Sequence, residues 1–415
     1  MPTGLLVRGV RLLSGAVGDL YARDGVLAAG WPAGTGERPA GGGPAGPAAD
    51  AVLDLGPGWT ALPRLAEAHV HLDKTLLGPR WYPHLPGERL SDRIELEARQ
   101  LAGGGSLPVE PVEVRAARLL GRLVRRGATL VRSDVDVTPR LGLRRVEALL
   151  ALRERWRQVV DVQLVAFPQE GLVGAPGAPG LLREAVEAGV EVVGGLDPQG
   201  YDGDRAAHLD TVFGLAEATG ARIDLHLHER GELGESTLLE VAVRTRTLGL
   251  SGRVAVSHAF ALADLPAERL GRVIATLADA GVAVVTGLPG EGLLPPLAWL
   301  RALGVTVAAA SDHVRDAWSP FGQADPLERA ALAACLVGWR TDADLTAALD
   351  LVTGAPAAVL GAPAALLRPG DPADFTLVPA SGVPEAVVER PLDRLVVRAG
   401  RVVVRGWTLV ESVGP

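Results

Sequence analysis

The strongest constraint on the fold is a regular alternation of short apolar runs and amphipathic helices that begins near residue 61. Eight runs have the character of buried strands, and they end near His71, Asp136, Phe167, Asp197, Glu229, His258, Thr286 and Asp312. Helical periodicity separates them and continues beyond them, over 112–126, 143–158, 205–219, 236–248, 266–280, 327–337 and 343–352. Repeated strand–helix units with apolar strands are typical of a parallel sheet. The pattern predicts an α/β fold with a (β/α)8 TIM barrel.

The two ends of the chain follow a different pattern. Residues 1–58 contain short alternating segments and the pair Asp24-Gly25, which is typical of a hairpin, while 34–50 is a loop rich in Gly, Pro and Ala. Strand patterns return at 372–378 and 394–404. Because neither end has enough apolar surface to fold alone, we expect them to join. The predicted division is a composite β-sandwich from 1–58 and 366–415, beside a barrel over 59–365.

Composition limits the partners and the location. The net charge is −8 and no basic run carries interleaved aromatic residues, so nucleic acid is not an expected partner. We see no signal-peptide pattern and no run approaching 18 apolar residues, so we expect no membrane span. The single cysteine, Cys335, lies in an apolar helical run and is expected to be buried. One cysteine excludes a disulfide within the chain, and a reducing cytoplasm fits.

Histidines gather where the predicted strands end. Six of the eight stand at or just after a strand: His69, His71, His226, His228, His258 and His313. In a barrel, catalytic residues sit at the carboxyl ends of strands. Residues two apart on a strand share a face, so each His-x-His pair can offer two imidazoles to one metal.

Any one of these histidines alone is more often a solvated or capping residue than a ligand. Together with Asp312 they supply imidazoles and a carboxylate from strands 1, 5 and 8, which suits a divalent metal with open coordination. The spacing does not decide between His226 and His228 as the ligand from strand 5. We expect His84 and His208 to be surface or structural residues.

A series of motifs makes a family resemblance specific. In order along the chain they are His69-Val-His-Leu-Asp-Lys, Ala166-Phe-Pro-Gln-Glu-Gly, Val193-Gly-Gly-Leu-Asp-Pro, Asp224-Leu-His-Leu-His-Glu, Val256-Ser-His and Ser311-Asp-His-Val-Arg-Asp-Ala-Trp. This series resembles the cytosine deaminase branch of the amidohydrolase superfamily and is similar to the N-isopropylammelide aminohydrolases of triazine degradation. The resemblance runs from about residue 56 to 405.

The resemblance implies a metal shell and a set of catalytic roles. It implies that the metal ligands are His69, His71, His226 and Asp312. Asp312 would also accept the proton of the attacking water, His258 would orient that water, and Glu229 would protonate a ring nitrogen and help to expel the amine. It implies substrate contacts for Gln169, Lys74, His228, His313 and Trp318.

The lysine content bears on the number of metals. Lys74 is the only lysine, and in the resembling sequences the same His-x-His-x-Asp-Lys motif carries a lysine, so we expect it to contact substrate. Binuclear amidohydrolases usually bridge two metals with a carboxylated lysine from strand 4 or 5, and neither strand here has one. We therefore expect one divalent metal per chain, Zn(II) or Fe(II), with Mn(II) also suited to the shell. The resemblance also suggests a homo-oligomer.

The chain departs from the family pattern around the pocket. His313 stands where cytosine deaminases carry an aspartate. His228 also stands where aspartate is common, and it is followed here by Glu229. The strand-2 pattern Arg-Thr-His-Val-Asp reads Arg132-Ser-Asp-Val-Asp. These departures put cytosine itself in doubt as the substrate.

Three functions remain open at this point. The first is hydrolytic removal of an amine from an amino-substituted nitrogen heterocycle such as a pyrimidine or triazine, and Glu229 and Gln169 favour it. The second is hydrolysis of a cyclic or exocyclic amide on the same scaffold. The third is a metal-free binding protein, which would be expected to have lost the ligands that this chain retains.

Overall fold

Eight parallel strands form the central sheet in the described part of the chain. The computed structural model describes residues 4–28, 51–85, 87, 89–101, 108–288 and 294–410. In spatial order the strands are β6 (Leu65–Val70), β7 (Ala128–Asp136), β8 (Asp161–Phe167), β9 (Val192–Leu196), β10 (Arg222–His226), β11 (Val254–Ser257), β12 (Val282–Thr286) and β13 (Val307–Ala309). Their order in space is their order in sequence, which confirms the predicted alternation.

The sheet closes into a barrel between β13 and β6. The amide of Asp312 donates to the carbonyl oxygen of His69 at 2.8 Å, and the amide of His71 donates to the carbonyl oxygen of Asp312 at 3.2 Å. These bonds lie at the carboxyl ends of the two strands, so the closure itself brings the first and eighth strand ends together.

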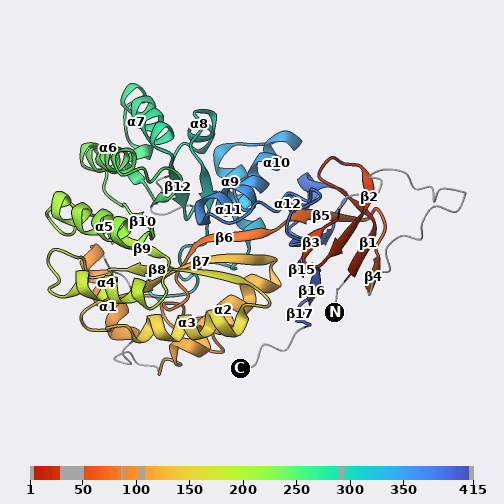
Figure 1. Cartoon of the computed structure of the whole chain (residues 1–415), viewed down its shortest axis with the longest axis horizontal. Helices are drawn as coiled ribbons and strands as arrows, with labels where there is room; N and C mark the ends of the chain where they lie inside the picture. Colours follow the sequence, from red (N-terminus) through yellow and green to blue (C-terminus); the bar gives the residue numbers. More distant parts are fainter. Residues whose placement is uncertain are drawn as a thin grey trace, which may run out of the picture.

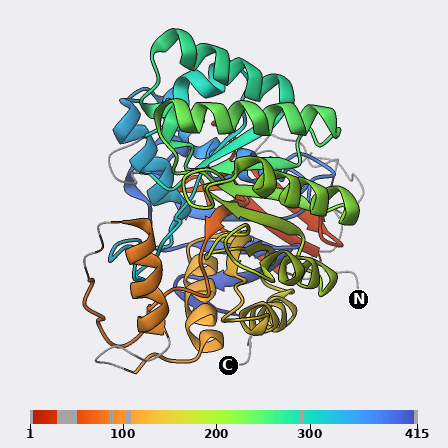
Figure 2. The ribbon, with the colours of Figure 1, turned by 90° about the vertical axis from the view of Figure 1, so that its left-hand side faces the viewer.

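Helices surround the barrel strands, as Figures 1 and 2 show from two directions. They are α1 (Leu90–Arg99), α2 (Val112–Arg125), α3 (Arg144–Trp156), α4 (Ala178–Glu187), α5 (Arg205–Thr219), α6 (Gly231–Thr247), α7 (Ala267–Ala280), α8 (Leu297–Ala302), α9 (Pro326–Val337), α10 (Asp342–Asp350), α11 (Gly354–Leu360) and α12 (Val383–Glu389). The sequence sets their ends locally. The Asp204 side chain accepts from the amide of Ala207 at the start of α5, and Gly220 ends that helix in a left-handed conformation.

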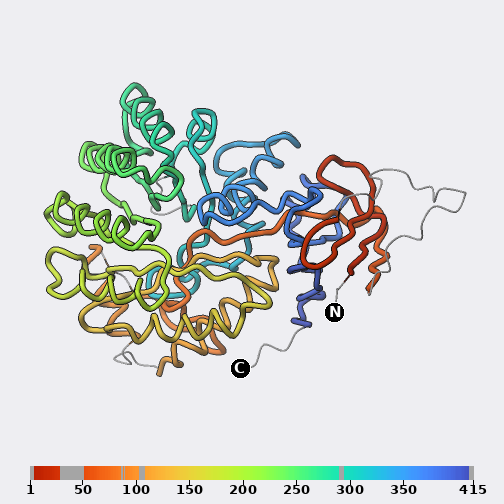
Figure 3. The backbone as a smooth tube through the Cα atoms, viewed as in Figure 1, coloured from red at the N-terminus to blue at the C-terminus, as the bar shows by residue number. Residues whose placement is uncertain are grey.

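Strands from both ends of the chain form a second sheet. It contains β1 (Gly4–Arg11), β2 (Val17–Arg23), β3 (Val26–Leu27), β4 (Ala51–Asp54), β5 (Trp59–Pro63), β14 (Phe375–Pro379), β15 (Leu395–Arg398), β16 (Arg401–Arg405) and β17 (Thr408–Leu409). Figure 3 shows these segments side by side, away from the barrel. β5 pairs with β14 and joins the two chain ends, so the predicted fold class is confirmed.

Details of the terminal sheet agree with local sequence signals. The Asp24-Gly25 turn connects β2 and β3, which pair antiparallel. The sheet has a small core of its own, with Leu5, Val7, Phe375 and Leu377 among its buried residues. The division at residue 59 stays a prediction, although β5 pairs within this sheet. The predicted loop at 34–50 lies outside the described residues.

Two features of the helices were not anticipated. α1 falls in the long β6–α2 connection, where no helix was predicted. Cys335 lies on α9 as expected, but it is exposed rather than buried. The buried positions of α9 include Leu327, Ala330, Ala333 and Ala334, and Cys335 falls on the opposite side of the helix.

One helical stretch, Asp342–Leu360, is long and apolar enough by length and composition to cross a membrane. It comprises α10 and α11, and 56% of its apolar window is buried inside the protein. A core helix of a soluble protein meets the same criterion, so the stretch is weak support for a membrane span.

A buried ion pair fastens the terminal sheet to the barrel. The Arg394 guanidinium, just before β15, donates to both carboxylate oxygens of Asp325 at 2.9 and 2.8 Å. Asp325 is the N-cap residue of α9. Both side chains are buried, and Arg126 adds a contact of 3.3 Å to the same carboxylate. This bidentate geometry holds α9 against the sheet.

We expect Arg394→Ala to lower the free energy of unfolding by about 3 kcal/mol, because it removes the bidentate partner of a buried carboxylate. The Leu327 amide at 3.0 Å and Arg126 at 3.3 Å would be its remaining partners. Urea unfolding followed by circular dichroism measures this loss. Arg272→Ala is the control, since it removes an exposed pair with Glu268 and should cost about 0.5 kcal/mol or less. Similar small losses in both variants would contradict the role of the Arg394 pair.

Candidate metal centre and active site

Three imidazoles converge at the carboxyl ends of the barrel strands. His69 lies in β6, His71 follows that strand, and His226 is the last residue of β10. Their ring centroids are 5.3 Å apart for His69–His71, 4.6 Å for His69–His226 and 5.5 Å for His71–His226. All three are almost fully buried. The structure therefore brings together the three histidines that the resemblance selected.

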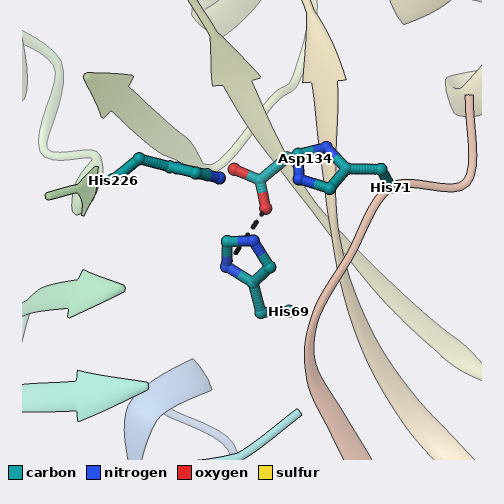
Figure 4. A group of neighbouring side chains, drawn as sticks. All are labelled: His69, His71, Asp134 and His226. Carbon is teal, nitrogen blue, oxygen red and sulfur yellow. Dashed lines mark ion pairs between the residues drawn. The ribbon is translucent and has the colours of Figure 1, made fainter. Parts of the chain in front are cut away.

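Two carboxylates face this cluster. Asp312 Oδ1 lies 3.3 Å from His69 Nε2 and 3.4 Å from His71 Nε2. On the other side, Asp134 of β7 lies among the same rings, with Oδ2 3.6 Å from His69 Nδ1 (Figure 4). Asp134 was not predicted to be a site residue. One ligand atom from each of His69, His71, Asp134 and His226 lies within 4.8 Å of the others.

The polar atoms of the cluster fit a divalent cation. Buried atoms without a hydrogen-bond partner include His69 Nε2, His71 Nδ1, both ring nitrogens of His226, and Asp312 Oδ1. Buried polar groups normally have partners, because desolvation without one is costly. Imidazole nitrogens and carboxylate oxygens are the ligands of zinc and of comparable transition metals. A cation site requires nitrogen and oxygen atoms with free lone pairs that converge in this way.

The protonation states of the cluster follow from burial and charge. Burial, reinforced by the neighbouring imidazoles, holds the pKa of His226 well below its usual range. The ring is therefore neutral and has a lone pair that can bind a metal ion. Burial opposes a charge on Asp312, but the His313 and His258 imidazoles outweigh it and hold the pKa of Asp312 well below its usual range. For His69, burial is outweighed by Asp134 and Asp312, which raise the pKa to about 9.

A chain of hydrogen bonds orients His69 from behind. His69 Nδ1 lies 2.9 Å from Ser257 Oγ, and Ser257 donates to Asp224 at 2.8 Å. Arg132 in turn donates to the other oxygen of Asp224 at 2.9 Å. Because the Ser257 hydroxyl proton is used on Asp224, its oxygen accepts from His69 Nδ1–H. In the neutral form of His69 this places the proton on Nδ1 and leaves Nε2 free to bind a metal.

Strand ends at the site adopt unusual backbone conformations. Asp197, His258 and Asp312 have φ angles of 36°, 72° and 56°, in the left-handed region that non-glycine residues rarely enter. They follow β9, β11 and β13. Strained residues of this kind concentrate at functional sites. Here all three residues with a left-handed backbone line the cavity.

A cavity of about 1050 Å³ opens above the imidazoles. Its lining includes predicted site residues from the later strand ends, namely His228, Glu229, His258, Asp312, His313 and Trp318. Apolar side chains form much of its outer wall, among them Leu233, Phe260 and Leu288. The cavity is large enough for a small heterocycle with a substituent.

Glu229 and His228 are each held by defined partners. The Glu229 carboxylate accepts from the amides of Gln199 and Gly200 at 2.7 and 2.9 Å, and from the Thr237 hydroxyl. His228 Nδ1 lies 2.9 Å from the Asp197 carboxylate. That contact places a proton on Nδ1 and fixes the orientation of the ring.

His258, His313 and Trp318 form two stacks at the cavity. The His258 ring stacks on His228 with centroids 4.4 Å apart. His313 stacks between His71 at 4.7 Å and Trp318 at 5.3 Å, and its Nδ1 lies 2.7 Å from Asp316. The predicted pocket residues at the ends of strands 6 and 8 thus lie around the cluster of His69, His71 and His226.

Lys74 and Gln169 lie deeper than the resemblance implied. Lys74 is 1% exposed and donates to Gln169 Oε1, with Asp136 at 3.2 Å and Glu97 at 3.4 Å. Burial is outweighed by these carboxylates, so the pKa of Lys74 is held above its usual range and the ammonium stays charged. Neither Lys74 nor Gln169 is among the described residues that line the cavity. Their proposed contact with substrate stays a prediction.

Of the remaining histidines, His208 on α5 is fully buried with Nδ1 2.6 Å from Asp202, and His84 is exposed. Neither lies in the cluster.

A model of the amidohydrolase family matches residues 52–404. The chain belongs to this family. It is a metal-binding hydrolase that acts on carbon–nitrogen bonds.

Named amidohydrolases are similar over nearly the whole chain. The crystal structure of N-isopropylammelide isopropylaminohydrolase from Burkholderia multivorans ATCC 17616 is 39% identical, with a TM-score of 0.89 over 98% of this chain and 100% of that one. 5-Methylcytosine deaminase from Klebsiella pneumoniae, liganded with 5-fluorocytosine, is 27% identical, with a TM-score of 0.80 over 98% of each chain. Pterin deaminase from Rhizobium rhizogenes (strain K84 / ATCC BAA-868) is 29% identical over 93% of this chain and 88% of its own length. The predicted branch of the family is confirmed.

Sequence reasoning missed several residues of this amidohydrolase site. Asp134 and Ser257 face the imidazoles, and Glu97 of α1 contacts both Lys74 and Trp318, the latter at 2.5 Å. The signal for Asp134 was present, because three charged residues, Arg132, Asp134 and Asp136, stand at alternate positions of a fully buried strand. No comparable local pattern marks Ser257 or Glu97.

We expect Ser257→Ala to weaken Zn²⁺ binding by about 10-fold to 100-fold, as other losses of a partner behind a histidine ligand do. Competition with a chromophoric chelator measures the Kd. Thr129→Val is the matched control, because it removes another buried strand hydroxyl, one without a hydrogen-bond partner, and should leave the Kd unchanged. Equal affinities in both variants would show that Ser257 does not set the tautomer.

Proposed function

We propose that this amidohydrolase is a hydrolytic deaminase (aminohydrolase) that removes an amine from an amino-substituted nitrogen heterocycle with one divalent metal. The observation that carries the proposal is the convergence of the His69, His71 and His226 imidazoles, with Asp312 Oδ1 3.3 and 3.4 Å from Nε2 of His69 and His71, next to a cavity that Asp312 and Glu229 line. Relatives named for amidohydrolase or deaminase activity on N-isopropylammelide, 5-methylcytosine and pterin support the class of reaction.

In the proposed mechanism His69, His71, His226 and Asp312 hold the cation. The cation would lower the pKa of a water toward neutrality and so supply the nucleophile. Asp312 is ionised and lines the cavity, and it would also accept the proton of that water. The absence of a lysine from β9 and β10 supports one metal rather than a lysine-bridged pair. Zn(II), Fe(II) and Mn(II) all suit these ligands.

His258 and Glu229 would handle the heterocycle. Burial holds the pKa of His258 well below its usual range, so the neutral ring can donate one hydrogen bond at the cavity without carrying a charge. Glu229 would carry a proton to a ring nitrogen and then to the departing amine, which makes the amine a better leaving group. Its three protein donors fix the carboxylate at the cavity.

The edge of the bound heterocycle would face different side chains in this protein from those in cytosine deaminases. The resemblance places aspartate where this chain has His228 and His313. His228 Nδ1 lies 2.9 Å from the Asp197 carboxylate, and His313 is flanked by Asp312 and Asp316. These two carboxylates outweigh burial and raise the pKa of His313. We therefore propose that the substrate is a pyrimidine, triazine or related heterocycle other than cytosine itself, and that Trp318 forms a wall of its pocket.

We further propose that the protein is a homo-oligomer located in the cytoplasm.

An ammonia- and amine-release screen over aminopyrimidines, aminotriazines, pterins and cyclic amidines tests the proposal. We expect turnover of at least one member, loss of turnover after chelation, and recovery with one equivalent of Zn²⁺ or Fe²⁺ per chain. We expect Asp312→Asn to abolish turnover, while Asp210→Asn at an exposed pair on α5 serves as the control. Near-wild-type rates in Asp312→Asn would contradict the mechanism, and release of carboxylate from cyclic amides alone would identify an amide hydrolase.

We expect Glu229→Gln to lower kcat by about 100-fold to 10,000-fold, because it removes the proton carrier, while the metal Kd stays within twofold of wild type. Steady-state kinetics and metal competition measure the two quantities on the same preparation. A parallel loss of metal would instead place Glu229 among the ligands, and an unchanged kcat would remove it from the reaction.

A further inference from the structure

Asp134 is a buried carboxylate whose oxygens both lack a hydrogen-bond partner in the described structure. The side chain is 0% exposed and lies on β7, inside the barrel. The ring nitrogen that faces it, His69 Nδ1, is 3.6 Å away and is already 2.9 Å from Ser257 Oγ. Asp134 therefore has a charge that the protein alone does not satisfy.

The buried aspartates Asp224 and Asp136 each have at least one hydrogen-bonded oxygen, whereas neither oxygen of Asp134 has a partner among the described residues. Asp224 accepts from Arg132 and Ser257. Asp136, two residues along the same strand, accepts from Arg145 at 2.7 Å and lies 3.2 Å from Lys74. An ionised carboxylate buried without partners costs several kcal/mol. A cation within reach of Asp134 would offset that cost.

The surrounding atoms place such a cation. The ligand atoms of Asp134, His69, His71 and His226 lie within 4.8 Å of one another. A metal about 2.0–2.2 Å from each ligand needs ligand atoms no more than about 4.4 Å apart. A shift of a few tenths of an ångström closes the difference. Figure 4 shows the Asp134 carboxylate directed into the three imidazoles rather than away from them.

We propose that Asp134 is a direct carboxylate ligand of the bound cation, additional to Asp312. The inference rests on the proposed metal-dependent function and extends it. Three neutral imidazoles and two carboxylates would balance the charge of a divalent ion.

Asp134→Asn tests the proposal with readouts other than activity. We expect the Kd for Zn²⁺ to rise by more than about 100-fold, beyond the loss typical of a residue behind a ligand. The metal-free variant should melt at the same temperature as metal-free wild type or higher, because an unsatisfied buried charge is removed. The visible absorption of the Co²⁺-loaded variant should change in band position and intensity, because the coordination changes. Asp134→His should bind Co²⁺ with a third, distinct spectrum.

The controls separate this inference from the proposed function. Thr129→Val, on the same strand, should match wild type in all three measurements. If wild type binds one metal and His226→Ala loses it, the proposed metal centre stands whatever Asp134 does. A Kd for Asp134→Asn within twofold of wild type, an unchanged Co²⁺ spectrum, or a lower melting temperature of the metal-free variant would each overturn direct ligation by Asp134.

Discussion

The site depends on the closure of the barrel between its first and last strands. Backbone hydrogen bonds between His69, His71 and Asp312 join β6 to the segment after β13, and in the same three residues Asp312 Oδ1 lies 3.3 and 3.4 Å from the two Nε2 atoms. Glu67 reinforces this junction, because its carboxylate accepts from the amides of His69 and Ser311. The hydrogen bonds that complete the fold therefore also set the spacing of the metal ligands.

Around that junction the protein stores unfavourable interactions that a cation would relieve. Three buried imidazoles with unpartnered nitrogens lie against Asp134 and Asp312, and Asp312 also has a left-handed backbone. Burial raises the pKa of Asp134 above its usual range, although His69 opposes this shift. The chain from Arg132 through Asp224 and Ser257 keeps His69 in the required tautomer. Because the ligands of such a site are already in place, little free energy is lost to rearrangement when the cation binds.

Much of this arrangement could be predicted from the sequence. The strand–helix alternation gives the barrel because periodicity is local, and histidines at strand ends indicate the site because barrels place chemistry there. The resemblance selected His226 over His228, which spacing could not do. The positions of α1, Ser257 and Glu97 depend on which distant segments pack together, and no local pattern encodes that. Lys74 shows the same limit: its uniqueness marked it as important, but its burial beside Asp136 and Glu97 came only from the structure.

The central claim is that one cation is held where the strand ends meet. Anomalous X-ray diffraction from crystals of the metal-loaded protein, recorded above and below the absorption edge of the bound metal, tests it directly. The account predicts a single peak per chain, within coordination distance of His69, His71 and His226 and of the facing carboxylates. Two peaks per chain, or a peak elsewhere with the three imidazoles unligated, would contradict it.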